Sequence, residues 1–106
     1  MSDSKYFCDL SALTSEERGR YAEVAKQLPG QVEAIDELEK GFAFTFPISK
    51  ENFMLVAEFI TYEGSCCPFL SFKLNWTSGE TLGRLAVTGE AEAKPFIQAE
   101  FSMLQR

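Results

Sequence analysis

The chain has 106 residues, of which 45% are apolar and 25% charged, with ten phenylalanines. This composition argues against disorder and predicts one domain, residues 1–106, whose core needs no disulfide or structural metal. A net charge of −6 without a cluster of Lys and Arg argues against nucleic acid and membrane surfaces as partners.

The cellular location is predicted from the lack of an export signal. Residues 1–10 contain no apolar core or small-residue cleavage site, and the apolar stretch 53–60 is too short to span a bilayer. We therefore expect a cytoplasmic protein. Its three cysteines, an odd number, argue against a disulfide framework and for reduced thiols. Any disulfide that forms is expected to be a reversible, regulatory one rather than a structural one.

Three segments have helical patterns. Thr14 and Glu17 form the pattern of a capping box, which predicts a helix that starts there and ends at Pro29-Gly30. Ser49 is the expected N-cap of a second helix, and we expect Gly64 to end it in a left-handed conformation. A third helix is predicted over residues 92–104, with Pro95 in its first turn.

Two β-hairpins separate these helices. Residues 31–47 form the first, in which the strand from Gln31 to Leu38 is followed by the strict alternation of Phe42, Phe44 and Phe46. Residues 70–87 form the second, with apolar side chains alternating up to Trp76 and a turn at Ser78-Gly79. Trp76 and the phenylalanines are expected to be core residues.

The element order is therefore α-β-β-α-β-β-α. It predicts an α+β two-layer sandwich with a four-stranded, mostly antiparallel sheet and helices mainly on one face. The strand order does not follow from the pattern. The wetter face is also a candidate homodimer surface, because Phe69 is expected to point away from Phe72, with Tyr62 near it.

Two adjacent cysteines, Cys66 and Cys67, lie at the predicted corner between the second helix and the next strand. Pro68 disfavours a helical conformation at Cys67, so the two side chains should diverge, and one of them should enter the core. Buried cysteines often act as inert apolar filler, and this reading leads to an alternative function: a homodimeric structural or interaction module.

The other reading is a soft-metal site. Cys8 would join Cys66 and Cys67 if the N-terminal arm runs alongside the corner, and thiolates select Hg(II), Cu(I), Zn(II) or trivalent arsenic over Mg(II) and Ca(II). Structural zinc is the least favoured of these, because adjacent cysteines chelate a tetrahedral ion poorly. Glu63 is expected to cap the corner or support the ligands, or to be a solvated helix residue.

A thiol redox sensor is the third reading, with a vicinal disulfide between Cys66 and Cys67. Glu63 and the end of a helix both disfavour a thiolate there, which argues against it. Enzymatic activity is not expected, since the chain has no histidine to pair with a nucleophile and no glycine-rich phosphate loop.

Three segments of the chain resemble a family of small, largely uncharacterised bacterial proteins. Residues 63–74 resemble its E-x-x-C-C-P-F-x-x-F-x-L segment, residues 8–10 its N-terminal C-x-L segment, and residues 88–97 its T-G-x-x-G-A-K-x-F-L segment. Glu90 and Glu92 depart from this pattern. The resemblance implies an association with heavy-metal handling, without a settled reaction, and groups the three cysteines together.

The leading hypothesis from the sequence is a non-enzymatic cytoplasmic protein that binds a soft metal ion. Its predicted ligands are Cys8, Cys66 and Cys67, with Glu63 outside the ligand set. The hypothesis depends on one spatial condition, namely that the N-terminal arm lies against the corner after the second helix.

Overall fold

The computed structural model describes residues 9–104 of the chain, so Cys8 lies outside the described residues. These residues form the predicted order α-β-β-α-β-β-α, which confirms the α+β class. The elements are α1 (Ser15–Gln27), β1 (Ala34–Leu38), β2 (Gly41–Pro47), α2 (Lys50–Cys66), β3 (Ser71–Asn75), β4 (Leu82–Thr88) and α3 (Lys94–Glu100).

The four strands form one antiparallel sheet in the order β1-β2-β4-β3. Phe44 pairs with Ile35 on one side and Leu85 on the other, and Leu85 pairs with Leu74. Because paired residues point to the same face of a sheet, such rows place the alternating apolar side chains on one face.

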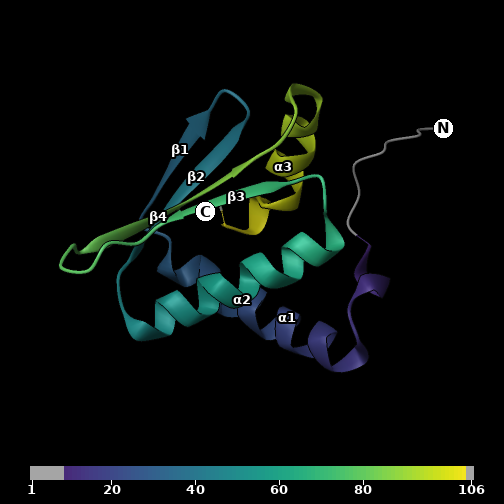
Figure 1. Ribbon diagram of the computed structural model, residues 1–106, viewed down its shortest axis with the longest axis horizontal. Coiled ribbons are helices and arrows are strands. Elements are labelled where there is room, and N and C mark those ends of the chain that lie inside the picture. The colour runs from purple at the N-terminus through teal and green to yellow at the C-terminus, as the bar shows by residue number, and fades with distance from the viewer. Residues whose placement is uncertain (1–8, 105–106) are drawn as a thin grey trace.

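All three α-helices cover this apolar face. The ring of Phe101, which follows α3, lies 6.3 Å from that of Phe44 in β2 and 5.7 Å from that of Phe59 in α2. Figure 1 shows α1 and α2 side by side on one side of the sheet, with the first described residues near the C-terminal end of α2. The two-layer sandwich is therefore confirmed.

The other face of the sheet carries small and polar residues. One row across it consists of Asp36, Ala43, Ala86 and Lys73. The aromatic side chains proposed for a dimer surface lie elsewhere.

The expectation that Phe69 points away from Phe72 is wrong. The two rings pack against the same core, and the ring of Phe69 contacts that of Phe96 at 5.1 Å. Tyr62 contacts Tyr21 on the helical side of the molecule. The homodimer itself stays a prediction.

Several element boundaries differ from the predicted ones. β1 starts at Ala34 rather than Gln31, because a 3₁₀ helix over Leu28–Gln31 follows α1. Gly64 does not end α2, which continues to Cys66, and Gly79 is the one residue with a positive φ in the part of the chain that the structure describes. Pro68 determines where α2 ends, because the residue before a proline, here Cys67, avoids the helical region of backbone conformation.

The last helical region is divided into three short pieces. A 3₁₀ helix over Ala91–Ala93 precedes α3, and another over Ser102–Leu104 follows it, while Pro95 lies in the first turn of α3 as predicted. Within residues 9–104, no helix combines the length and the apolar character that crossing a bilayer requires.

The capping box of α1 gives a test of the local sequence signal. The Thr14 hydroxyl accepts from the Glu17 N–H at 3.1 Å, and the Glu17 carboxylate accepts from the Thr14 N–H at 2.8 Å. We expect Thr14→Ala to lower the free energy of unfolding by about 1 kcal/mol, measured by urea denaturation. Thr61→Ala is the control, because Thr61 is exposed within α2 and caps no helix. Equal stability of Thr14→Ala and the wild type would contradict the capping role.

Candidate metal site

The two adjacent cysteines lie where α2 ends. Cys66 is the last residue of the helix, and Cys67 leaves the helical region with φ −128° and ψ 72°, as predicted from Pro68. The Cys67 N–H still donates to the Glu63 carbonyl oxygen at 2.7 Å. Cys66 and Cys67 are 1% and 0% exposed, so both side chains enter the core rather than one of them.

The N-terminal segment passes beside this corner. The Asp9 N–H donates to the Cys66 carbonyl oxygen at 3.0 Å, and Asp9 caps the 3₁₀ helix over Leu10–Ala12. The described start of the chain therefore meets the spatial condition of the metal hypothesis. Ligation by Cys8 stays a prediction, because that residue lies outside the described range.

A compact group of candidate ligands lies between α2 and α3. Glu63, Cys67 and Glu100 each offer one ligand atom, and these atoms all lie within 4.8 Å of one another. Glu63 and Cys67 are fully buried, whereas Glu100 is half-buried. Two of these three residues come from the corner and one from the end of α3, so the fold brings them together from distant parts of the sequence.

The spacing within this group suits a small ion. The Cys67 Sγ atom lies 3.6 Å from the Glu63 Oε1 atom. Tetrahedral zinc with Zn–S bonds of about 2.3 Å and Zn–O bonds of about 2.1 Å places its sulfur and oxygen ligands about 3.6 Å apart. The two atoms therefore need little movement to share one ion.

The oxidation states of the two cysteines differ. Cys66 is a free thiol, whereas Cys67 is disulfide-bonded. The expectation of reduced thiols is thus wrong for Cys67, because an odd number of cysteines excludes complete pairing but not a single bridge. The adjacent cysteines do not form a vicinal disulfide. A disulfide sulfur carries no negative charge, so Cys67 becomes a strong metal ligand only after reduction.

Burial makes the two carboxyl groups hard to ionise. It raises the pKa of Glu63 to about 7, with a further rise from the charge of Glu100 and an opposing effect of the hydrogen bond from Tyr21. Burial also raises the pKa of Glu100. A nearby positive charge favours the ionised form of such a buried carboxyl group, and a bound cation would supply that charge.

Cys66 lies near the same group without belonging to it. Burial raises the pKa of its thiol, and the negative charges of Glu63, Asp9 and Glu100 raise it further. These neighbours favour the protonated form of the Cys66 thiol. Acidic groups gathered around one corner favour a cation over an anion there.

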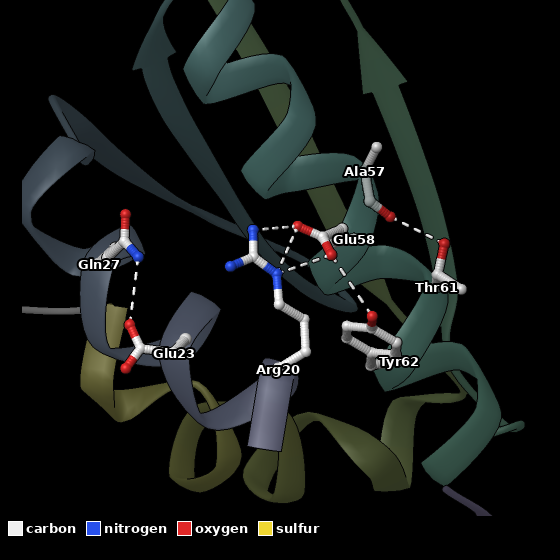
Figure 2. Close-up of polar contacts among 7 residues, drawn as sticks. All are labelled: Arg20, Glu23, Gln27, Ala57, Glu58, Thr61 and Tyr62. Atoms are coloured by element: carbon white, nitrogen blue, oxygen red, sulfur yellow. Dashed lines mark hydrogen bonds and ion pairs between the residues drawn. The ribbon is translucent and has the colours of Figure 1, made fainter. Parts of the chain in front are cut away.

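A partly exposed ion pair joins α1 to α2. Figure 2 shows the Arg20 guanidinium of α1 facing the Glu58 carboxylate of α2, with a shortest contact of 2.6 Å. The Tyr62 hydroxyl donates to Glu58 at 3.4 Å. The pair lies next in sequence to Tyr21, whose hydroxyl donates to Glu63.

Neither Glu100 as a candidate ligand nor the burial of Glu63 was predicted from the sequence. The reading of Glu63 as a solvated residue is wrong, because its side chain is fully buried, and the corner is capped by its backbone carbonyl. A signal was available for both residues. Glu63 follows Phe59 by four positions and Glu100 follows Ile97 by three, so each places a charge on an apolar helical stripe.

Comparisons with protein-family models, with curated proteins and with solved structures find no match to this chain. The resemblance described from the sequence therefore stays a prediction. The function has to be argued from the geometry of the site.

Proposed function

We propose that the reduced protein binds a divalent, thiophilic metal ion through Glu63, Cys67 and Glu100. The observation that carries the proposal is the grouping of one sulfur and two carboxylate oxygens within 4.8 Å at a mostly buried position. Burial raises the pKa of both carboxyl groups, so their ionised forms gain most from a cation that compensates their charge.

The donor set favours zinc or a similar ion over the softest ions. Mixed sulfur and oxygen ligands suit borderline ions, whereas Cu(I) and Hg(II) favour sites with several sulfurs. In the described part of the chain, Cys67 is the one cysteine of this ligand group. The three-sulfur site expected from the sequence would instead require Cys8 and Cys66 to join it.

The proposal depends on a reduced Cys67. A reducing compartment such as the cytoplasm keeps thiols free for metal binding, which agrees with the location predicted from the sequence. Oxidation to the disulfide withdraws the thiolate from the ligand set. Metal binding should therefore depend on the redox state of the protein.

Zinc titration of the reduced and oxidised proteins tests the proposal. With a phosphine reductant and at pH 8, we expect one Zn²⁺ ion per chain in competition with a chromophoric chelator. The oxidised protein should compete much less well, and Mg²⁺ should not compete in either state.

Glu100→Gln provides the ligand control for this titration, since it removes a carboxylate from the half-buried edge of the site. We expect it to weaken zinc binding by about tenfold or more, because loss of even an outer hydrogen-bond partner costs roughly 10–100-fold. Failure of the reduced wild type to bind zinc would remove the proposed function.

A further inference from the structure

We propose that Tyr21 restricts Glu63 to one metal-binding oxygen, and that the site therefore selects small four-coordinate ions such as Zn²⁺ over larger thiophilic ions such as Cd²⁺. This inference rests on the proposed function. It names the class of ion that the site takes and assigns its selectivity to a residue outside the ligand group.

The two oxygens of Glu63 have different partners. Oε2 accepts a hydrogen bond from the Tyr21 hydroxyl, whereas Oε1 lies 3.6 Å from the Cys67 Sγ atom. One oxygen is thus held toward α1, while the other faces the group of ligands. A carboxylate fixed in this way offers one oxygen to an ion at the site.

Tyr21 is itself held by its surroundings. Its ring stacks on Phe59 at 6.4 Å and meets the edge of Tyr62, also at 6.4 Å. Phe59 lies on the same face of α2 as Glu63, one turn earlier. Any rotation of the Glu63 carboxylate toward two-oxygen binding would therefore have to break a hydrogen bond from a ring that cannot easily follow.

The phenol of Tyr21 is the donor in its hydrogen bond to Glu63. Burial, together with the hydrogen bond and negative charge of Glu63, raises its pKa. A neutral hydroxyl contributes no charge to the ligand set. Its effect on an ion is therefore one of geometry rather than of charge.

The number of oxygens that a carboxylate offers discriminates between ions of different size. Tetrahedral Zn²⁺ is satisfied by single-oxygen carboxylate ligands. Larger ions have longer bonds and more ligands, and commonly bind both oxygens of a carboxylate, as Ca²⁺ does. Cd²⁺ is larger than Zn²⁺, but both ions bind thiolate. A difference in their affinities therefore reports the geometry of the carboxylate rather than the presence of the sulfur ligand.

Tyr21→Phe tests this inference, because it removes the hydroxyl and keeps the ring contacts. In reduced protein at pH 8, we expect its affinity for Zn²⁺ to fall about 10–100-fold, the usual cost of losing an outer hydrogen-bond partner. Its affinity for Cd²⁺ should fall less, so that the preference for Zn²⁺ over Cd²⁺ decreases. Bound Co²⁺ should also lose part of the visible absorption that marks a tetrahedral site.

Tyr62→Phe is the matched control, since the Tyr62 hydroxyl donates to Glu58 rather than to a ligand. It should leave both affinities and the cobalt spectrum unchanged, and circular dichroism should show that both variants are folded. Zinc binding by the wild type with an unchanged ion preference in Tyr21→Phe would overturn this inference alone. A wild type that binds neither ion would overturn the proposed function, and this inference with it.

Discussion

Cys67→Ser should abolish tight zinc binding by the reduced protein, whereas Cys66→Ser should preserve it. Cys67 belongs to the group of three ligand atoms, and Cys66, its neighbour in the chain, does not. Loss of a direct thiolate ligand should weaken binding by more than the roughly 100-fold upper cost of losing an outer partner. The three-cysteine site predicted from the sequence requires a strong loss for both variants. The two variants therefore distinguish that site from the ligand group found in the structure.

In the reduced protein, where neither substitution removes a disulfide, the two substitutions are well matched for stability. Cys66 is 1% exposed and Cys67 is 0% exposed. Burying a serine hydroxyl at either position should therefore lower the free energy of unfolding by a similar amount, about 1–3 kcal/mol. Chelator competition gives the affinities, and the thiolate-to-metal charge-transfer band of bound Co²⁺ identifies the sulfur ligand. Equal zinc affinities of the two variants would show that Cys67 has no special role.

The free energy of unfolding of the metal-free protein should fall as the pH rises through 7, and Glu63→Gln should remove most of this fall. The pKa of Glu63 is about 7 in the folded protein, against an ordinary value of 4.5. Above pH 4.5 the carboxyl group ionises readily in the unfolded chain, while the folded protein keeps it protonated until about pH 7. Its contribution to stability is therefore fully present below pH 4.5 and is lost as the pH rises through 7.

The size of this effect follows from linkage. Each pKa unit between the folded and unfolded states corresponds to about 1.4 kcal/mol, so the loss amounts to about 3 kcal/mol by pH 8. Glutamine is neutral at every pH, and its side-chain oxygen can still accept from Tyr21. At pH 8, metal-free Glu63→Gln should thus be more stable than the wild type, while at pH 4 the two should be similar.

Urea denaturation at both pH values, with a chelator and one fixed redox state, measures this difference. Glu100, whose pKa is also raised, stays in both proteins and leaves a residual slope of the same sign. Glu58→Gln is a control of opposite sign, because Arg20 lowers the pKa of Glu58 and its contribution is lost toward low pH. A variant Glu63→Gln that is less stable than the wild type at pH 8 would mean that the ionised carboxylate stabilises the fold.

The sequence predicted the features of the fold that depend on local interactions. Thr14 and Ser49 both cap helices as expected, because each bonds to a backbone N–H three residues ahead. The alternation of Phe42, Phe44 and Phe46 correctly predicted a strand whose three aromatic rings are buried. These signals need no knowledge of distant parts of the chain.

The features that depend on distant contacts were not predicted. The strand order β1-β2-β4-β3 follows from the pairing of β2 with β4, which are separated by the whole of α2 and β3. The aromatic contact between Phe69 and Phe96 likewise joins the corner to α3. No local pattern in the sequence specifies either pairing.

The site was predicted in part for the same reason. Adjacent cysteines before a proline marked the corner, and the condition that the N-terminal arm lies against this corner is met at Asp9. Glu100 was not, since its nearness to Cys67 exists only after α3 has packed on the core. A charged residue on an apolar helical stripe was the available signal for both Glu63 and Glu100, but this signal does not specify that the two side chains meet.

The position of the ligand group between α2 and α3 has a mechanical consequence. An ion bound there would tie the corner at Cys67 to Glu100 near the C-terminus, across the contact of Phe59 with Phe101. It would act as a removable crosslink, adding about 2.7 kcal/mol of folding free energy when the free ion is at 100 times its dissociation constant. The rigidity of the C-terminal helix would then follow the supply of metal in the surroundings.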